Sequence, residues 1–448
     1  MEKMTLMRAA SACGGRLCGV YDPNTELGRV VIDGRDVQPG DFFVADRGEK
    51  VDGHDYIGAA FERGAVCCLA QRVPEGEGRP ILLTEDVQLA LEKIAGEYRR
   101  DLRIPMIGIT GSVGKTSAKE MISAVLEQRL SVLKTEKNLN NQIGVPMTIS
   151  RIQPWHQAAV VEMGISGFGE MRTLAKIVRP TVAVFTIIGH AHLEFLHDRA
   201  GVFRAKTEML EEMDENGVVL VNGDDEYLSR LRCRQKVLRF GLGENCQIRA
   251  VDVQTDSLGH NSCIICFEDR RIPVTIPAFG RHMIYAALEG AAVGLVMGLT
   301  DEEIARGVAS YETVGRRSAV TDTGRITLID DCYNANPDSV KCGVDSLLQL
   351  PGRHLCVLGD MLELGEGERE MHRDIGAYAA QKGVDLVLCT GPLGKEIAVG
   401  AGDRGRWYPD KKLLIQALPD LIAPGDNVLV KASRGMRFEE IAEVLKNI

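Results

Sequence analysis

One segment carries the residue types that hold the phosphates of a nucleotide: an apolar strand, a turn containing glycine, and Lys-Thr-Ser at the start of a helix, within 106–121. A helix N-terminus offers unpaired backbone N–H groups and a partial positive charge, and glycine lets that backbone close around phosphate. We expect Lys115 to reach the terminal phosphates and Thr116 to hold Mg²⁺. Ile109 stands where the strict GxxxxGK(S/T) pattern has its first glycine, but the flanking strand and helix favour a phosphate loop.

Two further groups of polar side chains follow predicted strands. Glu162 lies near the end of the strand AAVVEMG, and the carboxyl ends of parallel strands face the ligand crevice of such a sheet. Glu162 is therefore a candidate Mg²⁺ ligand, and an exposed strand-end glutamate is the simpler alternative. The next strand leads into HAHLEFLH, with His190, His192 and His197. These histidines are compatible with zinc, with one histidine supplementing the oxygen ligands of magnesium, or with a polar strand end.

Asp and Asn residues follow two strands later in the chain. In DDCYNANPDSV, a strand continues into Asp331, Asn334 and Asn336, and an Asn side chain offers the donor and acceptor that suit the edge of a purine. In RHLCVLGD, a strand delivers Asp360 to a loop, where a carboxylate can accept the hydroxyls of ribose. An ordinary turn rich in Asn and Pro explains the first motif equally well, and a solvated loop explains the second.

The elements that must position these residues alternate from residue 104 onward between Val/Ile-rich runs and helical patterns. This alternation is the βαβ signature of a mostly parallel sheet with both faces covered. An alternating segment at 251–277 predicts an antiparallel insert, and a long helix is expected at 281–297. The predicted parallel strands form two series, at 105–110, 158–163, 181–187 and 218–221, and at 326–330, 354–358, 386–390 and 428–431.

The predicted fold class is α/β with three domains. The chain has 448 residues, and a domain typically has about 100–200. Residues 1–102 are expected to form a small α/β N-terminal domain with short strands and a helix at 56–63. Residues 103–314 are expected to form a central ATPase domain with the phosphate loop on a parallel sheet. Residues 315–448 are expected to form a C-terminal Rossmann-like domain, with the boundary in TVGRRSAV.

The composition argues against several classes of protein. There are 53 Lys and Arg residues against 63 Asp and Glu, a net charge of −10, so we expect no nucleic-acid partner. The longest apolar stretch, near 291–299, falls short of the ~20 residues that span a bilayer. The N-terminus predicts an amphipathic helix rather than an export signal. The 12 scattered cysteines indicate free thiols in a reducing compartment, so we expect a cytoplasmic protein.

Together these motifs resemble those of the Mur ligases, the ATP-dependent amide-forming enzymes of peptidoglycan synthesis, over essentially the whole chain. GITGSVGKTS resembles that family's own phosphate loop, GxxGxxGK(S/T). KNLNNQIGVP, IGHAHLEFL and DCYNANPDS are most similar to the segments of the member that adds D-alanyl-D-alanine. The resemblance implies an ATP-dependent acid–D-amino-acid ligase that joins D-alanyl-D-alanine to UDP-N-acetylmuramoyl-tripeptide through an acyl phosphate and releases ADP and phosphate.

The resemblance also implies metal ligands. Lys115 would contact phosphate, Thr116 and Glu162 would serve one Mg²⁺, and His192 would serve a second. Lys206, in FRAKTEM, falls where the family carries a carbamylated lysine that helps to hold the second ion. The implied cofactors are therefore ATP, two Mg²⁺ and CO2 as a carbamate on Lys206. Without the resemblance, Lys206 would be interpreted as a solvated residue of a helix.

The remaining ligand contacts are implied in the same way. Arg316 would reach the nucleotide from the interdomain boundary, and with Lys115, Lys206 and His192 it completes the implied catalytic set. The residues implied to bind ATP are Gly111, Gly114, Lys115, Thr116, Ser117, Asn334, Asn336 and Asp360. Those implied to bind substrate are Arg35 at the uridine nucleotide, Asn138, Asn140 and Asn141 at the muramoyl-peptide, and Lys431, Ser433 and Arg434 beside the reaction centre.

Other hypotheses stay open. Another Mur enzyme or a folylpolyglutamate-type ligase would use a different acceptor, a mechanical or signalling phosphate-loop NTPase would hydrolyse ATP without an amine, and a scaffold would bind nucleotide without turnover. The separation of Lys115 and Asn334 across a domain boundary predicts that the C-terminal domain closes onto the central one during turnover. We expect a monomer with no membrane span.

Overall fold

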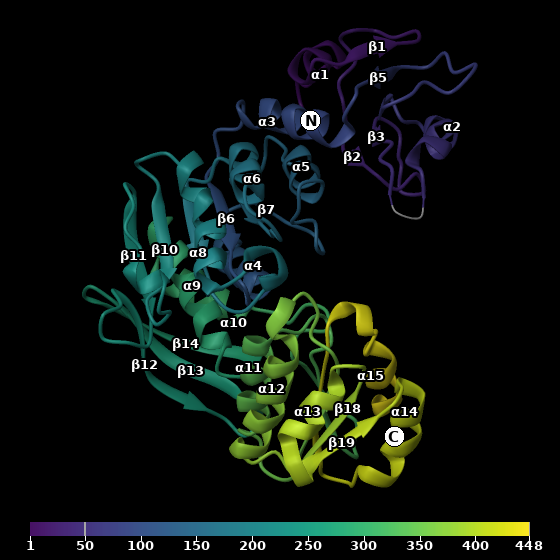
Figure 1. Ribbon diagram of the computed structural model, residues 1–448. Coiled ribbons are helices and arrows are strands. Elements are labelled where there is room, and N and C mark those ends of the chain that lie inside the picture. Colours follow the sequence, from purple (N-terminus) through teal and green to yellow (C-terminus); the bar gives the residue numbers. More distant parts are fainter. Residues whose placement is uncertain (49–50, 448) are drawn as a thin grey trace.

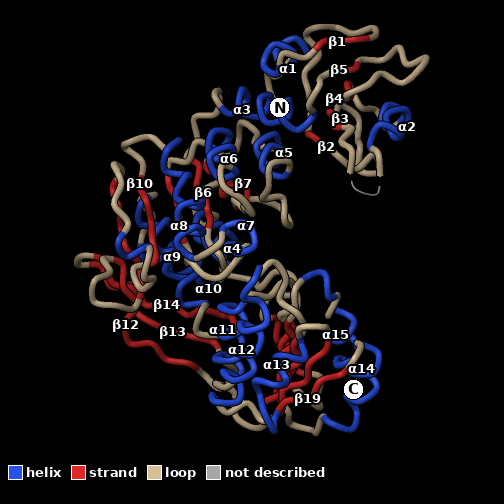
Figure 2. The backbone as a smooth tube through the Cα atoms, viewed as in Figure 1, coloured by secondary structure: helices blue, strands red, loops and turns tan. Residues whose placement is uncertain are grey.

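The computed structural model describes residues 1–48 and 51–447, and its strands form three sheets that follow one another along the chain. Figure 1 shows the N-terminal part at one end of the molecule, the central part in the middle and the C-terminal part at the other end. Figure 2 shows helices packed around each sheet. The expected α/β class and three-domain organisation are confirmed.

The N-terminal sheet has five short strands in the order β1-β5-β4-β3-β2, and β1 is antiparallel to β5 while the other neighbours are parallel. Tyr98, near the end of helix α3, donates a hydrogen bond of 2.6 Å to the Ile152 carbonyl of the central domain, which ties the two parts together. The elements are α1 (Leu6–Cys13), β1 (Arg16–Cys18), β2 (Val30–Val31), β3 (Phe42–Val44), α2 (Ile57–Glu62), β4 (Cys67–Ala70), β5 (Ile81–Leu83) and α3 (Val87–Arg99).

The central sheet has nine strands in the order β14-β13-β12-β11-β10-β9-β6-β8-β7. Strands β7 to β12 and β6 pair in parallel, and β12, β13 and β14 pair antiparallel, so the predicted insert extends the parallel sheet at one edge. The strands are β6 (Met106–Thr110), β7 (Val132–Lys134), β8 (Ala158–Glu162), β9 (Val182–Phe185), β10 (Val218–Asn222), β11 (Lys236–Gly241), β12 (Ile248–Thr255), β13 (His260–Phe267) and β14 (Arg270–Phe279).

Helices cover both faces of this sheet because its strands are apolar on both sides. Along β9, Val184 packs into the core beneath α4 and α9, whereas its neighbour Phe185 packs into the core on the other face. The long helix expected at 281–297 is present as α9. The helices are α4 (Lys115–Leu126), α5 (Gly144–Ser150), α6 (Glu170–Val178), α7 (Leu193–Leu196), α8 (Arg199–Thr207), α9 (Met283–Val296) and α10 (Asp301–Ala309).

The C-terminal sheet has six strands in the order β15-β16-β20-β17-β18-β19, all parallel except the edge strand β15. The strands are β15 (Ala319–Asp322), β16 (Thr327–Asp330), β17 (His354–Leu358), β18 (Leu386–Thr390), β19 (Gly405–Tyr408) and β20 (Asn427–Lys431). The helices are α11 (Pro337–Leu347), α12 (Glu368–Lys382), α13 (Gly394–Ala401), α14 (Lys411–Leu421) and α15 (Glu439–Lys446).

The sequence patterns do not predict four of these strands. Three of them, β7, β15 and β19, lie at sheet edges, where partial exposure weakens the apolar pattern. The fourth, β11, lies inside the sheet but has charged residues and only two fully buried positions. In the part of the chain that the structure describes, no helix combines the length and the apolar character needed to cross a bilayer.

Candidate active site

The phosphate loop joins β6 to α4 and adopts a conformation that requires glycine. Gly111 and Gly114 have φ angles of 155° and 87°, and a Cβ atom on Gly111 would lie 1.9 Å from Thr186 Oγ1. Lys115 is the first residue of α4 and folds back so that its Nζ donates to the Gly111 carbonyl at 2.7 Å. The loop backbone and the lysine therefore face the same space, as phosphate binding requires.

A buried carboxylate lies beside this loop. Glu162, at the end of β8, is 2% exposed, and its Oε2 accepts a hydrogen bond of 2.9 Å from the Thr116 hydroxyl. Its Oε1 accepts one of 2.8 Å from Asn140 Nδ2. A hydroxyl and a carboxylate next to a phosphate loop are oxygen donors of the kind that Mg²⁺ prefers. The two predicted ligands of the first metal are thus brought together.

Lys206 is not a solvated helix residue but is 1% exposed on α8. Burial, and then the positive charge of Lys115, hold the pKa of Lys206 well below its usual value. The pKa of Lys115 is also lowered, by burial against the opposing effect of Glu162, with a further contribution from Arg317. Burial thus disfavours the charged form of both amines, most strongly at Lys206.

The two histidines of the HAH motif point to different partners. His190 Nδ1 lies 3.1 Å from both carboxylate oxygens of Asp338, whereas His192 Nδ1 lies 2.5 Å from Glu363 Oε2. The third, His197, packs near the Phe168 ring. Over residues 1–48 and 51–447, no group of three His, Cys, Asp or Glu side chains is close enough to hold a metal ion.

A cavity of about 340 Å³ separates the phosphate loop from the C-terminal domain. On the C-terminal side, Lys431 donates to Asp331 Oδ2 at 2.6 Å and to the Asn334 carbonyl at 3.0 Å, which fixes the loop after β16. Asn336 caps α11 by accepting from the Ser339 N–H. The predicted site residues that line the cavity are Gly114, Lys115, Ser117, Asn138, Asn140, Asn141, Glu162, His192, Asn334, Asn336 and Lys431.

Other predicted residues lie outside the cavity wall. Arg316 is held within its own domain, with Nη1 at 2.5 Å from Asp330 and Nη2 at 2.6 Å from Glu443. Asp360 accepts the backbone N–H groups of Leu393 and Gly394 at the start of α13, at 3.0 and 2.7 Å. The structure therefore gives both side chains a local structural role and does not bring them to the cavity.

The remaining predicted contacts are also engaged elsewhere. Arg35 is exposed on the N-terminal domain and pairs with Asp33 at 2.7 Å. Ser433 supports the C-terminal loops by donating to the Ala335 carbonyl and accepting from the Leu362 N–H. Arg434 lies over the Tyr333 ring, 5.1 Å from its centroid. Gly111 and Thr116 lie behind the cavity wall, in contact with Lys115 and Glu162, and Lys206 is near enough to Lys115 for its charge to lower the pKa of Lys206.

The cavity also has wall residues that the sequence does not single out. Arg317, the neighbour of Arg316, lines it and lies 4.0 Å from the centroid of the Tyr333 ring. His282, at the start of α9, contributes a buried Nδ1 that has no hydrogen-bond partner among the described residues. The adjacent arginines of the GRR segment signal one cationic contact, but sequence alone does not show which of the two faces the cavity.

A phosphate loop on a mostly parallel sheet, facing the polar loops of a second α/β sheet, defines a nucleotide-binding protein of the phosphate-loop class. Family models described as "Mur ligase family, catalytic domain", "Mur ligase middle domain" and "Mur ligase, glutamate ligase domain" match residues 26–141, 109–294 and 315–434. The chain belongs to the Mur ligase family.

Relatives match along the whole length. The chain is 35% identical to the UDP-N-acetylmuramoyl-tripeptide--D-alanyl-D-alanine ligase of Bacillus subtilis (strain 168), over 99% of each chain. A crystal structure of MurF from Acinetobacter baumannii superposes with a TM-score of 0.92 at 28% identity, over 99% of each chain. MurF ligase from Thermotoga maritima in complex with ADP gives a TM-score of 0.84 at 30% identity, over 94% of this chain and 97% of that one.

Proposed function

We propose that this chain is an ATP-dependent ligase that joins D-alanyl-D-alanine to UDP-N-acetylmuramoyl-tripeptide and releases ADP and phosphate. The observation that carries the proposal is a single cavity in which Lys115 of the phosphate loop faces Asn334 and Asn336 of the C-terminal domain. Membership of the Mur ligase family supports amide formation, and the names of the full-length relatives support this choice of substrates.

The reaction must turn an unreactive carboxylate into an electrophile. A terminal carboxylate oxygen of the tripeptide attacks the γ-phosphorus of ATP, the bond to the ADP oxygen breaks, and an acyl phosphate forms. The amine of D-alanyl-D-alanine then attacks the acyl carbon, the bond to phosphate breaks with its electron pair on phosphate, and the amine loses a proton. Lys115 stabilises the charge on the transferred phosphoryl group, because positioning and electrostatics supply most of the catalysis in such transfers.

Two Mg²⁺ ions and a carbamate complete the proposal. Thr116 and Glu162 would hold the first ion, and their oxygen atoms are already in contact. His192 and a carbamate on Lys206 would hold the second. A carbamate forms when a neutral Nζ attacks the carbon of CO2 and loses a proton, so the lowered pKa of Lys206 favours it. Bound ions would neutralise the negative charge that builds up on the phosphates.

Nucleotide contacts come from both sides of the cavity. We propose that Ser117 and the backbone of Gly111 and Gly114 bind the phosphates, and that Asn334 and Asn336 lie beside the adenine. We add Arg317 to the proposed nucleotide contacts because it lines the cavity. We also add Asp331, which lines the cavity and accepts a hydrogen bond from Lys431. The contacts of Arg316 and Asp360 with the nucleotide stay predictions, since both side chains have partners within the C-terminal domain.

The substrate contacts extend from the N-terminal domain to the C-terminal one. Arg35 is proposed for the uridine nucleotide because its exposed guanidinium is free to leave Asp33 for a phosphate. The muramoyl-peptide would lie along Asn138, Asn140 and Asn141, which share one wall of the cavity. On the C-terminal side, we propose that Lys431, which lines the cavity, and its neighbours Ser433 and Arg434 bind substrate beside the reaction centre.

The remaining expectations are proposals about the whole molecule. We propose domain limits at 102/103 and 314/315, which separate the three sheets in sequence. A cytoplasmic location is supported by twelve cysteines that are all free thiols, and by nucleotide-linked substrates. We propose that the protein is a monomer, since both walls of the cavity come from one chain.

One assay tests the function against its alternatives. ADP release is measured with ATP and the UDP-linked tripeptide, with and without D-alanyl-D-alanine, and the product is identified by mass spectrometry. We expect release that depends on both substrates and a UDP-linked pentapeptide as product. Dependence on a single amino acid would indicate a sister ligase, release without any acceptor would indicate an NTPase, and binding of ATP without turnover would indicate a scaffold.

A further inference from the structure

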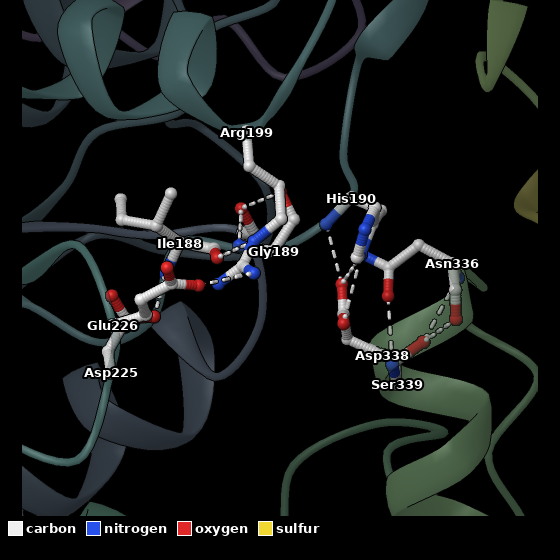
Figure 3. Close-up of polar contacts among 10 residues, drawn as sticks. Ile188, Gly189, His190, Arg199, Asp225, Glu226, Asn336, Asp338 and Ser339 are labelled. Carbon is white, nitrogen blue, oxygen red and sulfur yellow. Dashed lines mark hydrogen bonds and ion pairs between the residues drawn. The ribbon is translucent and has the colours of Figure 1, made fainter.

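One contact joins His190 of the central domain to Asp338 of the C-terminal domain (Figure 3), close to Asn336 and Ser339, which line the cavity. Asp338, in the first turn of α11, accepts the backbone N–H of His190 at 2.6 Å, and both its carboxylate oxygens lie 3.1 Å from His190 Nδ1. His190 belongs to the loop that follows β9, so the contact links residues 148 positions apart in the sequence. The Asp338 carboxylate therefore joins the two domains through both the backbone and the side chain of His190.

The central side of this contact is tied directly to the phosphate loop. Gly189, the residue before His190, donates its N–H to Ser112 Oγ at 2.9 Å, and Ser112 Oγ lies 3.3 Å from the Gly189 carbonyl. Ser112 in turn donates its backbone N–H to the Ile187 carbonyl at 2.8 Å. Because Ser112 is part of the phosphate loop and lines the cavity, a shift of this loop would move the contact with Asp338.

The two domains approach so closely at Gly189 that a larger residue there would displace the Asp338 carboxylate from its present position. A Cβ atom there would lie 2.2 Å from Asp338 Oδ2, far inside van der Waals contact. On the C-terminal side, Asp338 follows Asn336 by two residues, and Asn336 is the cap of the same helix. One carboxylate thus connects the phosphate loop with the loop that carries Asn334 and Asn336.

A second pair crosses the same boundary but cannot serve as a permanent link. His192 Nδ1 lies 2.5 Å from Glu363, and Glu194 donates its backbone N–H to the Glu363 carbonyl at 3.4 Å. His192 is a proposed metal ligand, so its contact with Glu363 competes with the metal. The contact of Asp338 involves none of the proposed metal ligands, so metal binding does not compete with it directly.

We propose that Asp338 is a positioning residue whose carboxylate holds the Asn334–Asn336 loop against the phosphate loop, so that ATP meets an assembled cavity. This inference rests on the proposed function, because it takes the cavity to be the ATP site. Apparent affinity falls in proportion to the population of the binding-competent arrangement. Loss of the carboxylate should therefore weaken ATP binding more than it slows the chemical steps that follow.

The test compares Asp338→Ala, Asp338→Asn and His190→Ala with Asp345→Ala. Asp345 is the matched control, because it lies on the same helix and accepts from Tyr378 within the C-terminal domain. We expect Asp338→Ala to raise the KM for ATP on the order of tenfold with kcat changed by less than about threefold. Asp338→Asn, which keeps an acceptor for the His190 N–H, and His190→Ala, which keeps that N–H, should show smaller increases.

Small-angle X-ray scattering without nucleotide provides a second measurement, since Asp338→Ala should expand the particle and Asp345→Ala should not. The wild-type enzyme must be active in the same assay. If Asp338→Ala then shows an unchanged KM for ATP and unchanged scattering, the positioning role is overturned and the ligase function stands. A fall in kcat that follows a loss of thermal stability would also overturn it, in favour of a purely structural role. If the wild type shows no ATP-dependent turnover, the proposed function fails, and the scattering comparison then decides the link by itself.

Discussion

The two walls of the cavity use their polar side chains differently. On the central wall, Lys115 and Glu162 face the site, and Thr116 lies behind them and donates to Glu162. On the C-terminal side, Arg316 and Asp360 lie outside the cavity wall and are occupied in holding their own domain together. The central wall is a continuous strand, turn and helix with one neighbouring strand, whereas the C-terminal wall is assembled from separate segments. On the central wall, the role of a residue therefore follows from its local chain geometry. On the C-terminal side, the role depends on partners that are distant in the sequence.

The largest expected effect is on the central wall. Replacing Lys115 by Ala should lower kcat by at least about a hundredfold, comparable to the loss of one donor to a developing negative charge. Steady-state ADP release with all three substrates measures it. Lys176→Ala, on an exposed lysine of α6, is the matched control and should behave as wild type. A folded Lys115→Ala enzyme with turnover within a few-fold of wild type would contradict the role assigned to this wall.

Lys206 tests whether a buried side chain behind the same wall is also functional. Lys206→Arg keeps a long basic side chain but offers no primary amine to CO2, so turnover should fall by roughly tenfold to a hundredfold, the range for residues that support a metal site. Depletion of CO2 should slow the wild type, and added bicarbonate should restore it. Because the pKa of Lys206 is lowered, the neutral amine that CO2 needs should be available without alkaline pH.

The carbamate itself is checked by native mass spectrometry of the whole enzyme. The wild type should carry the added mass of one CO2, and Lys206→Arg should not. A wild type that lacks this mass and is insensitive to bicarbonate would leave Lys206 as a buried amine without the proposed modification. The central wall would then resemble the C-terminal one, with a predicted residue in a structural role.

Sequence alone predicts the central wall well because its parts are neighbours along the chain. The phosphate loop follows from strand, turn and helix in one short segment, and Glu162 from its place at the end of the next strand. Lys206 follows only from family resemblance, because its burial depends on how α8 packs. The edge strands β7, β15 and β19 are missed, since partial exposure removes their apolar pattern.

On the C-terminal side, sequence alone does not predict which side chains face the cavity. Two adjacent arginines are chemically equivalent in the sequence, and Asp330 and Glu443 decide that Arg316 turns away from the cavity. Likewise, the partners that occupy Asp360 lie at the start of α13, more than thirty residues further on. Neither choice is visible in spacing or composition.

Two arginine variants test which of the adjacent arginines contacts the nucleotide. Their effects should be smaller than those of Lys115→Ala and Lys206→Arg. Arg317→Ala is expected to raise the KM for ATP about tenfold, which corresponds to ~1.4 kcal/mol of binding free energy. Arg316→Ala should instead lower the melting temperature by a few degrees with a smaller change in KM, because its two carboxylate partners lie within its own domain. Nucleotide titration and thermal melting of both variants separate the two roles. A raised KM for Arg316→Ala together with a lowered melting temperature for Arg317→Ala would indicate that Arg316 contacts the nucleotide.

The smallest effect is expected at Glu289, which shows that burial of an ionisable group does not by itself indicate function. Glu289 is 3% exposed in the middle of α9, away from the cavity, and burial raises its pKa well above the usual value. The folded state therefore binds this proton more tightly than the unfolded state, so stability falls as pH rises from the unfolded pKa of about 4.3 towards the folded one. Glu289→Gln removes this loss and should raise the melting temperature by roughly 2–4 °C at pH 8, and less at pH 5, with turnover unchanged. Thermal melting at both pH values measures this change in melting temperature. Glu62→Gln, at an exposed position on α2, is the control. An equal shift for Glu289→Gln at the two pH values would show that Glu289 does not titrate as its burial requires.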